Sequence, residues 1–373
     1  MSEITAITMP KWGLTMTEGK VIGWLKQPGD TVTAGDELLE IETSKITNVF
    51  EAPEAGILRR IVAAEGTTLP IGGLLAIVAP ESVPEGDIET FVAGFKAPEP
   101  AAEEASAAAV APRDIDAGGN RLRVLDIGGG DAVPVLLIHG FGADLNGWMF
   151  TQPALAEHRR AVALDLPGHG GSTKQLDGAA AENFAAAVDG ALDALGIERA
   201  HLVGHSLGGT VALTFASGQP DRVASLTLIA PAGFGPDIDA GFITGFVRAQ
   251  RRREMQDVLT LLVHDPALVS RQMVEDVLRY KRLDGVQAAL EAIADEWFPN
   301  GIQRIRQGAA LEGLTIPAQL IWGRNDRIIP AAHGAALAGR VPVHILDGAG
   351  HLPHMEKAGE VNRLIAEFIA AAD

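Results

Sequence analysis

One short segment of the sequence carries a serine in the setting that an activated serine requires. Residues 204–208 read Gly-His-Ser-Leu-Gly, directly after a predicted strand and before a helix that we expect to begin near Gly209. Small residues on both sides of Ser206 let the chain turn sharply enough to lift the hydroxyl out of a sheet. The pattern alone is only moderately specific, since a serine after a glycine turn also caps many helices, and without further motifs a helix cap would be the expected interpretation.

An acid and a histidine follow Ser206 at positions that complete a proton-transfer system. Asp326 comes after a predicted strand that ends at Trp322, and His351 comes after the next predicted strand. A serine attacks a carbonyl carbon when a histidine takes its proton and a carboxylate orients that histidine. Serine, aspartate and histidine in this chain order are typical of α/β-hydrolases. We therefore expect Ser206, Asp326 and His351 to form a catalytic triad.

The segment His-Gly-Phe-Gly at residues 139–142 ends an earlier strand and extends this resemblance to α/β-hydrolases. The resemblance implies that the amides of Phe141 and Leu207 form an oxyanion hole, in which one donor contributes roughly 10²–10³ to the rate. The loop at 165–170, Asp-Leu-Pro-Gly-His-Gly, also matches the family, and we expect a structural role for it. A serine in place of an aspartate at the elbow disfavours epoxide hydrolases and dehalogenases.

Several other histidines are expected to be structural or to line the pocket. They are His139, His169, His205 and His354.

A lysine in the N-terminal region lies between two predicted strands. Residues 42–47 read Glu-Thr-Ser-Lys-Ile-Thr, which places Lys45 at the tip of a hairpin. Most lysines on turns are simply solvated. A lysine held out rigidly can instead carry a prosthetic group that swings between active sites.

Residues 1–80 contain an internal repeat with a shift of 37 residues. The shift aligns Gly19 with Gly56 and Gly29 with Gly66, and it aligns apolar strand positions with one another, such as Leu38 with Leu75. Two similar half-sheets packed face to face produce such a repeat. The region is therefore predicted to be an all-β flattened barrel or sandwich.

The repeat, the Lys45 segment and Met-Pro-Lys-Trp-Gly at residues 9–13 together resemble the lipoyl domains of 2-oxo-acid and acetoin dehydrogenase complexes. The resemblance covers residues 1–80 and implies a lipoate attached covalently to Lys45. Biotinyl domains share the fold, but their carrier lysine normally lies between two methionines. The neighbours here are Ser44 and Ile46, which favours lipoate over biotin or an unmodified lysine.

Residues 81–113 are predicted to be a linker rich in Ala, Pro and Glu. Apolar residues at 88, 91, 92 and 95 allow one short helix there, packed on either domain. Residues 114–373 alternate strands and helices, which predicts an α/β-hydrolase domain with a mostly parallel sheet. Residues 236–312 interrupt the alternation with a helical insertion that we expect to form a lid.

The composition limits the ligands and the location. A net charge of −18 argues against nucleic acid as a partner. The absence of cysteine excludes disulfides and thiolate metal sites, and no metal site is expected. The chain starts without a signal peptide and has no apolar run of about 20 residues, so we expect a cytoplasmic protein with no membrane contact.

The lid carries a group of basic residues in this acidic chain. Two interpretations are open: a solvated helix face paired with acids such as Glu254 and Asp257, or a docking site for the phosphates of coenzyme A. The residues are Arg248, Arg251, Arg252, Arg253, Lys281 and Arg282.

The combination of both domains resembles the dihydrolipoamide acetyltransferase component of acetoin dehydrogenase complexes, in a form fused to a hydrolase domain. The resemblance implies that a thiamine-diphosphate enzyme acetylates the arm on Lys45, that the acetyl group passes to coenzyme A, and that a flavin-dependent dihydrolipoamide dehydrogenase reoxidises the arm. The trimer-forming acyltransferase domain with its His-x-x-x-Asp-Gly motif is not found in the sequence. The number of subunits in the expected oligomer therefore remains open.

Three other functions fit the same motifs. They are a carrier-linked thioesterase or esterase, a C–C bond hydrolase that acts on a diketone, and a lipoyl carrier scaffold without acyltransferase activity.

Overall fold

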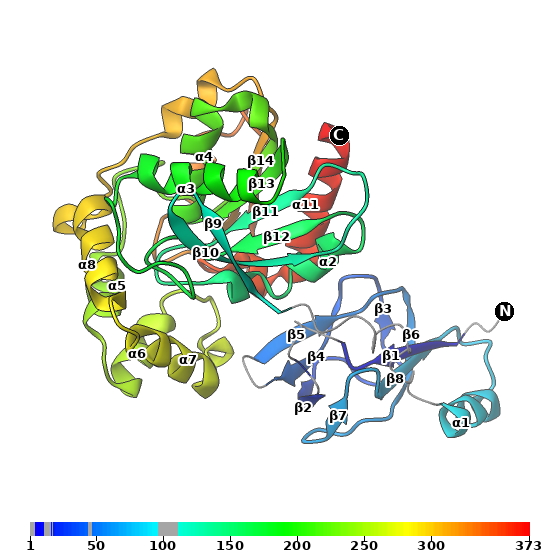
Figure 1. The fold of residues 1–373 in the computed structure, drawn as a ribbon. Helices are drawn as coiled ribbons and strands as arrows, with labels where there is room; N and C mark the ends of the chain where they lie inside the picture. Colours follow the sequence, from blue (N-terminus) through cyan, green and yellow to red (C-terminus); the bar gives the residue numbers. More distant parts are fainter. Residues whose placement is uncertain (1–3, 11–15, 17, 44–46, 96–110) are drawn as a thin grey trace. The chain divides into compact units, whose positions relative to one another are not determined.

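The computed structural model describes residues 4–10, 16, 18–43, 47–95 and 111–373 (Figure 1). Its contacts divide the chain into two units, Met1–Val110 and Ala111–Asp373. Each unit has hydrophobic clusters of its own, so each is described by itself. An all-β N-terminal unit and an α/β C-terminal unit confirm the predicted fold class. Across the described residues, no helix combines the length and the apolar character that crossing a bilayer requires.

The N-terminal unit consists of two antiparallel sheets, each with four described strands. One sheet has the order β1-β8-β6-β3, with β1 Thr5–Thr8, β8 Leu74–Ala79, β6 Gly56–Ile61 and β3 Thr31–Val32. The other has the order β5-β4-β2-β7, with β5 Thr47–Glu51, β4 Glu37–Glu42, β2 Glu18–Trp24 and β7 Thr68–Pro70. The sheets share one core, in which Val21, Ile41 and Leu58 are fully buried.

The internal repeat relates the two sheets. A shift of 37 residues carries β2 and β4 of one sheet onto β6 and β8 of the other. It also carries β3 onto β7, yet β3 pairs with β6 and β7 pairs with β2. Each half of the repeat therefore contributes one strand to the sheet formed mainly by the other half. The two predicted half-sheets thus exchange a strand. Gly29 and Gly66 occupy matching turns with φ of 100° and 81°, a backbone region that favours glycine.

The hairpin predicted around Lys45 has its two strands in the structure. Strands β4 and β5 pair antiparallel, with Glu42 opposite Thr47, so four residues connect them. Lys45 belongs to this connection, and residues 44–46 lie outside the described part of the chain. Residues 11–13 of the second lipoyl-like segment also lie outside it.

A short helix completes the N-terminal unit. Helix α1, Glu85–Gly94, follows β8 and buries Ile88 against Ile77 and Val83. The guanidinium of Arg59 donates to the carbonyl oxygens of Pro80 and Val83, at 2.7 and 3.0 Å. The helix allowed by the sequence thus belongs to the N-terminal unit, and residues 81–95 of the predicted linker are folded.

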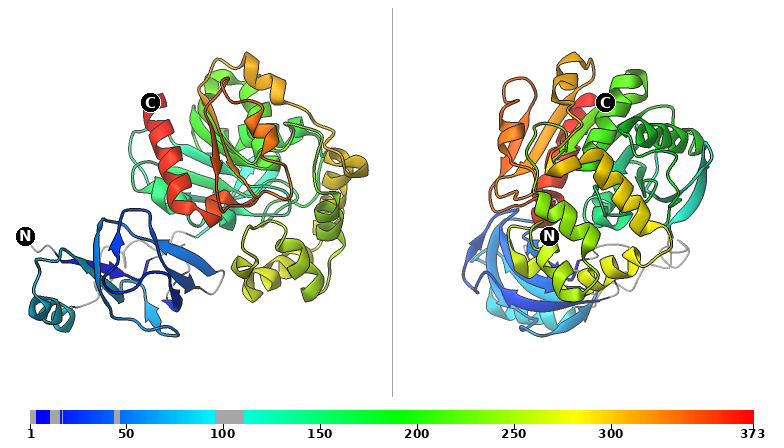
Figure 2. Two further views of the ribbon diagram at one scale, coloured as in Figure 1. Left: turned by 180° about the vertical axis from the view of Figure 1, so that it is seen from behind. Right: turned by 90° about the vertical axis from the view of Figure 1, so that its left-hand side faces the viewer.

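The C-terminal unit, residues 111–373, is described throughout and is built on an eight-stranded sheet of order β16-β15-β14-β13-β11-β12-β10-β9 (Figure 2). Six strands are parallel, which confirms the predicted mostly parallel sheet: β11 Val135–Ile138, β12 Ala161–Leu164, β13 Ala200–His205, β14 Val223–Ile229, β15 Ala318–Gly323 and β16 Val343–Leu346. An antiparallel hairpin that the sequence did not predict, β9 Arg113–Ala117 and β10 Asn120–Ile127, extends one edge. Strand β9 therefore begins inside the predicted linker.

Helices cover both faces of this sheet. Alternate residues of a strand point to opposite faces, so Leu136 and Ile138 face one helical layer while Val135 and Leu137 face the other. The first layer contains α3 Ala181–Ala194 and α4 Leu207–Gly218. The second contains α2 Gln152–Ala156 and α11 Ala358–Ala372. Two short helices, α9 Ala332–Ala335 and α10 Pro353–Glu356, lie beside the last strands.

The predicted insertion consists of four α-helices between β14 and β15. They are α5 Ala240–Arg248, α6 Arg252–Leu259, α7 Arg271–Lys281 and α8 Val286–Trp297. These helices lie together on one side of the sheet (Figure 1). Their buried side chains, such as Phe246, Met255 and Leu290, belong to the main core cluster. The lid is therefore packed into the C-terminal unit.

Candidate active site

Ser206 lies at a strained turn between β13 and α4. Its backbone has φ 51° and ψ −118°, a left-handed region that costs a non-glycine residue about 1–3 kcal/mol. The Ser206 amide donates to the carbonyl of Ile229 at 2.9 Å, which holds the turn against β14. Added Cβ atoms on Gly204 and Gly208 would collide with backbone, so both positions require glycine. Helix α4 begins at Leu207, earlier than predicted, because Ser206 itself takes the N-cap position.

Asp326 and His351 follow β15 and β16. They lie at the carboxyl ends of the parallel strands, as Ser206 does after β13. The Nδ1 atom of His351 and the Oδ2 atom of Asp326 are 2.8 Å apart, and both side chains are buried. The other carboxylate oxygen of Asp326 accepts from the amides of Ile328 and Ile329, at 2.8 and 2.9 Å. These bonds fix the carboxylate and, through it, the imidazole, whose Nε2 atom faces away from Asp326.

Hydrogen bonds connect the His351 loop to the serine turn. The Nε2 atom of His205 lies 2.8 Å from the carbonyl oxygen of His351, and the two rings are 4.9 Å apart. His205 is the residue before Ser206, so this bond places the His351 loop beside the serine. From the lid, the carbonyl of Leu262 accepts the His351 amide at 2.7 Å.

Glu356 supports the same loop, and sequence reasoning missed it. Its carboxylate accepts from the amides of Gly350 and His264, at 2.7 and 2.6 Å. Burial raises the pKa of this carboxyl, and the hydrogen bonds from these amides oppose the rise. A single glutamate near a helix normally reads as a surface residue, so the sequence held no signal for it.

The two predicted oxyanion-hole residues lie on either side of Ser206. Leu207 is the first residue of α4, where a helix leaves its amides without an intrahelical acceptor. Phe141 follows Gly140, at which an added Cβ would lie 3.0 Å from the Cβ of Ser206. Among the described residues, neither the Phe141 nor the Leu207 amide has a hydrogen-bond acceptor. Both donors are thus free beside the serine.

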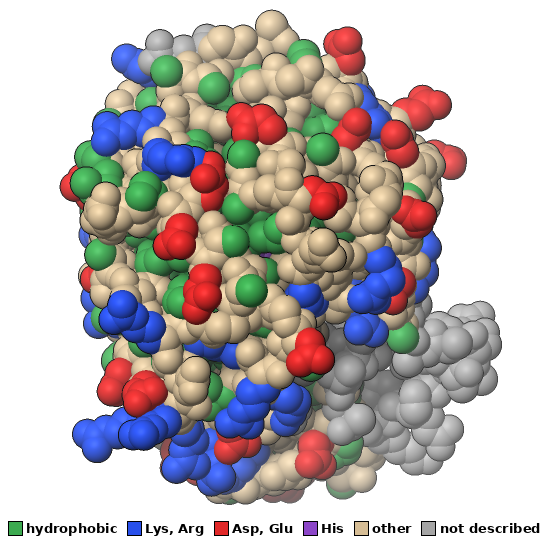
Figure 3. Space-filling model, turned by 60° about the vertical axis from the view of Figure 1, so that its left-hand side comes forward, with side chains coloured by type: hydrophobic (Ala, Val, Ile, Leu, Met, Phe, Trp, Pro, Cys, Tyr) green, Lys and Arg blue, Asp and Glu red, His purple; other side chains and the backbone are tan. Residues whose placement is uncertain are grey.

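Aromatic side chains of the lid pack against Phe141. The ring of Phe141 is 5.7 Å from that of Phe246 on α5 and 6.1 Å from that of Phe298 after α8. An added Cβ on Gly142 would collide with Phe246. In Figure 3, hydrophobic side chains gather near the centre of the face shown. The side chain of Phe141 is therefore surrounded by aromatic rings.

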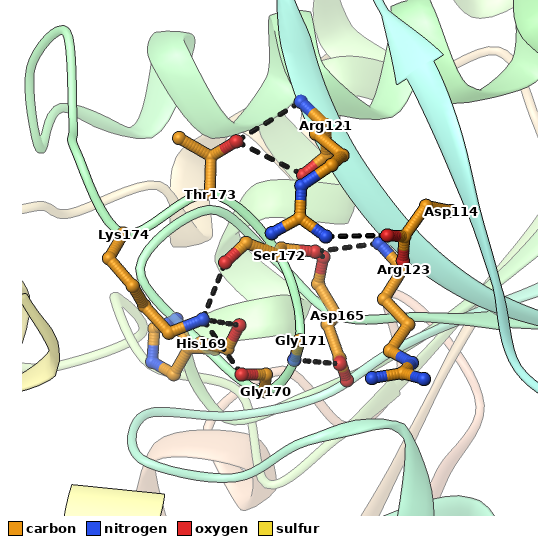
Figure 4. A network of polar contacts seen from close by, with 10 residues as sticks. All are labelled: Asp114, Arg121, Arg123, Asp165, His169, Gly170, Gly171, Ser172, Thr173 and Lys174. Carbon is orange, nitrogen blue, oxygen red and sulfur yellow. Dashed lines mark hydrogen bonds and ion pairs between the residues drawn. The ribbon is translucent and has the colours of Figure 1, made fainter. Parts of the chain in front are cut away.

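The loop at residues 165–174 is held by its own polar contacts (Figure 4). Buried Asp165 accepts from the amides of Leu145 and Gly171, at 2.7 and 2.6 Å. Burial raises the pKa of Asp165 to about 7, with a further contribution from Asp144. Lys174 donates to the carbonyl oxygen of Gly170 at 2.7 Å and to that of His169 at 3.1 Å. These contacts give the loop a structural role.

Buried neutral histidines surround the site. Burial lowers the pKa of His139 to about 4 and those of His169 and His354 to about 3. The pKa of His205 is also well below its usual value, again mainly because of burial. Unfolding would return these groups to a pKa near 6.5.

We predict that acid destabilises the C-terminal unit below pH 6.5. Between pH 6.5 and about 4 the unfolded chain binds protons that the folded unit does not, so the free energy of unfolding falls as pH falls. Each such histidine contributes roughly 1.4 kcal/mol per pH unit. Hydrogen exchange from pH 7 to 5, corrected for the intrinsic exchange rate, measures this loss. The N-terminal unit contains no histidine and is an internal control. Equal loss in both units would contradict the prediction.

Lys281 does not belong with the exposed arginines of the lid, contrary to the grouping made from sequence. It is 8% exposed, and its ammonium donates to the carbonyl oxygens of Phe246, Val247 and Ala249. Burial lowers the pKa of Lys281 to about 8. The Lys281 side chain caps the carboxyl end of α5, which is a structural function.

Comparison with known proteins assigns both units to families. Residues 5–78 match the family model described as biotin-requiring enzyme, and residues 133–358 match the α/β hydrolase fold. A dihydrolipoyllysine-residue acetyltransferase component of an acetoin cleaving system from Pseudomonas putida is 45% identical over 372 residues, 99% of each chain. The protein of the same name from Cupriavidus necator is 46% identical, over 98% of this chain and 97% of its own.

The C-terminal unit also resembles hydrolases that lack a carrier unit. A 2-hydroxymuconate semialdehyde hydrolase from Pseudomonas sp. strain CF600 is 34% identical, over 70% of this chain and 94% of its own. The solved structure of a meta-cleavage product hydrolase from Pseudomonas fluorescens IP01 has 27% identity and a TM-score of 0.64, over 70% of this chain and 98% of its own.

Proposed function

Because this chain belongs to the family of dihydrolipoyllysine-residue acetyltransferase components of acetoin cleaving systems, we propose that its C-terminal unit transfers an acetyl group from a lipoyl arm on Lys45 to coenzyme A. The observation that carries the proposal is the union of a carrier unit with the Ser206 turn and the Asp326–His351 pair in one chain. A tethered carrier presents its thioester at an effective concentration of order mM.

Lys45 is the proposed attachment site. The pairing of β4 and β5 leaves a four-residue connection that contains this lysine, which fits a carrier lysine on a hairpin. A lipoyl group there would supply the sulfur that holds the acetyl group as a thioester. Ser44 and Ile46 as its neighbours favour lipoate over biotin.

Ser206, His351 and Asp326 are the proposed catalytic triad. The Oγ atom of Ser206 attacks the acetyl carbon, and the C–S bond to the arm breaks. His351 takes the hydroxyl proton at Nε2 and gives it to the departing sulfur, while Asp326 orients the ring. The thiol of coenzyme A then attacks acetyl-Ser206, the C–O bond breaks, and His351 returns the thiol proton to Ser206.

The amides of Phe141 and Leu207 are the proposed oxyanion hole. Their free N–H groups flank Ser206, where charge develops on the acetyl oxygen. The enclosing rings of Phe141, Phe246 and Phe298 limit water around the acyl group. Exclusion of water favours transfer to a thiol over hydrolysis.

Two partners follow from the proposal by their chemistry. A thiamine-diphosphate-dependent enzyme must cleave acetoin and acetylate the arm, and a flavin-dependent dihydrolipoamide dehydrogenase must reoxidise the dithiol. The relatives' name, component of an acetoin cleaving system, supports such an assembly.

The second candidate function is C–C bond hydrolysis. The 34% identity to a protein named 2-hydroxymuconate semialdehyde hydrolase favours it, because a serine–histidine–aspartate triad also supports hydrolysis. An assay with 2-hydroxymuconate semialdehyde and unlipoylated protein separates the two functions. Turnover of this compound at a rate comparable with acetyl transfer would favour the hydrolase.

The direct test of acetyl transfer supplies S-acetyl-dihydrolipoamide with and without coenzyme A and measures acetyl-CoA and acetate. Acetyl-CoA with little acetate supports the proposal. Acetate formed at the same rate without coenzyme A would identify a thioesterase instead.

We predict that Asp326→Asn lowers the turnover number for acetyl-CoA formation by roughly 10³–10⁴-fold. The asparagine side chain keeps the shape of the aspartate, but its amide group stabilises the wrong tautomer of the His351 imidazole. Asp347→Asn is the control, since that carboxylate is 81% exposed and pairs only with Arg324 among the described residues. Equal rates for Asp326→Asn and the wild type, measured at saturating substrates, would remove Asp326 from the proposed triad.

A further inference from the structure

Four arginines of the lid lack a partner among the described residues of this acidic chain. Arg248, Arg252, Arg253 and Arg282, the arginine cluster, are exposed, and none forms an ion pair or hydrogen bond with another described residue through its side chain. Other arginines on these helices are paired. Arg271 bonds Glu275 at 2.8 Å, and Arg279 bonds Asp276 at 2.8 Å. The net charge of −18 makes four unpaired cations in one region unusual.

The buried lysine explains why these arginines lie together. Lys281, the last residue of α7, bonds the last carbonyls of α5 and that of Ala249 beyond it. Arg282 follows Lys281 directly, and Arg248 precedes Ala249. The carboxyl end of α7 is thus pinned beside the junction of α5 and α6, where Arg252 and Arg253 begin the next helix.

Charges at this junction act on one another. The carboxyl of Glu275 on α7 has a lowered pKa, first because of Arg271 and further because of Arg252. The exposed acidic residues nearest in sequence to the arginine cluster are Asp284, Asp257 and Glu254. Of these, Glu254 lies 3.9 Å from Arg251, which is outside the cluster. Figure 3 shows several Lys and Arg side chains, with Asp and Glu side chains among them, in the lower part of the view.

Helix α6 connects the arginine cluster to the proposed triad. It runs from Arg252 to Leu259, and Leu262 beyond it accepts the amide of His351. Eight helical residues span about 12 Å at 1.5 Å per residue, and the few residues after them bring the separation to about 15 Å. The cluster therefore lies about one helix length from the proposed general base.

We propose that the arginine cluster binds the phosphates of coenzyme A, an assignment that rests on the proposed acetyl transfer. Coenzyme A carries a pyrophosphate and a 3′-phosphate, and guanidinium groups bind phosphate oxygens in pairs. Its pantetheine arm has twelve bonds between the phosphate oxygen and the sulfur. That equals four residues of extended chain, or about 14 Å. The arm thus spans the distance from the cluster to His351.

The test reverses two charges of the cluster with Arg252→Glu/Arg282→Glu. The KM for coenzyme A should rise about tenfold or more, while kcat and the KM for S-acetyl-dihydrolipoamide stay within about twofold. Pantetheine, which has no phosphate, should have the same KM with variant and wild type. Calorimetry with adenosine 3′,5′-bisphosphate should show binding to the wild type and at least tenfold weaker binding to the variant.

The matched control is Arg199→Glu/Arg363→Glu, which changes the net charge equally. Arg199 precedes β13 at the edge of the sheet opposite Ser206, and Arg363 lies on α11. An equal rise of the coenzyme A KM in both double variants would overturn the proposal, since it would reflect net charge alone. A parallel rise for pantetheine would overturn it as well. Binding of the bisphosphate to the wild type but not to the variant, in a protein that forms no acetyl-CoA, would support the phosphate site and refute the acetyl transfer.

Discussion

Replacing Ser206 with alanine is expected to lower the rate of acetyl-CoA formation by about 10⁴-fold or more. The variant keeps the proposed oxyanion donors but has no side-chain oxygen to receive the acetyl group. Alanine tolerates the backbone at φ 51° about as poorly as serine, so the turn and its strain are preserved. The measurement is the steady-state rate with S-acetyl-dihydrolipoamide and coenzyme A.

Ser217→Ala is the control for this substitution. Ser217 lies on α4, the helix that follows the turn, and its hydroxyl bonds the carbonyl of Leu213 at 2.8 Å. Its loss removes a hydroxyl of the same helix without touching the reacting atoms. Turnover of Ser206→Ala within about tenfold of the control would mean that coenzyme A attacks the lipoyl thioester directly, with no acetyl-serine.

Replacing Lys45 with arginine is expected to abolish attachment of the lipoyl group. Arginine keeps the charge but lacks the primary amine that forms the amide bond. The variant should therefore give no turnover of acetoin with the partner enzymes. It should keep its activity with free S-acetyl-dihydrolipoamide, because the proposed triad lies in the other unit. Mass spectrometry of protein produced with lipoate ligase measures the first effect.

Lys20→Arg is the matched control for the proposed carrier lysine. Lys20 is an exposed residue of β2 in the same unit, and the variant should be lipoylated like the wild type. A lipoyl mass on the Lys45→Arg protein would reject Lys45 as the site. A biotin mass on the wild type, found in cells that make both ligases, would make the unit a biotin carrier.

The sequence predicted most of the strands and turns that have a recognisable local pattern of apolar residues and glycines. The mostly parallel sheet was predictable because the apolar runs of its strands are bounded by turns, and the turn glycines of the N-terminal unit marked its repeat. The hairpin of β9 and β10 was missed. Strand β9 reads Arg-Asp-Ile-Asp-Ala, with only two buried side chains at the sheet edge, too few to distinguish it from a polar linker.

Parts of the candidate site depend on contacts that no local pattern encodes. Motif spacing predicted the placement of Ser206, Asp326 and His351 on three strand ends. Lys281 looked like its exposed neighbours in the sequence, but folding buries it against the end of α5. Glu356 supports the His351 loop by accepting from the amides of His264 and Gly350. His264 is far from it in the sequence, and no motif marks either contact. Such roles arise only once the lid has packed.

The most direct test of the central claim follows one acetyl group on the protein itself. Wild-type protein, carrying labelled acetyl on its own lipoyl arm, is mixed with coenzyme A and quenched over time. Mass spectrometry then quantifies the acetylated protein, acetyl-CoA and acetate. Acetyl transfer by the C-terminal unit predicts that the arm loses its label to coenzyme A, and that Ser206→Ala retains it. Label that leaves as acetate, or leaves the wild type no faster than Ser206→Ala, would contradict the claim.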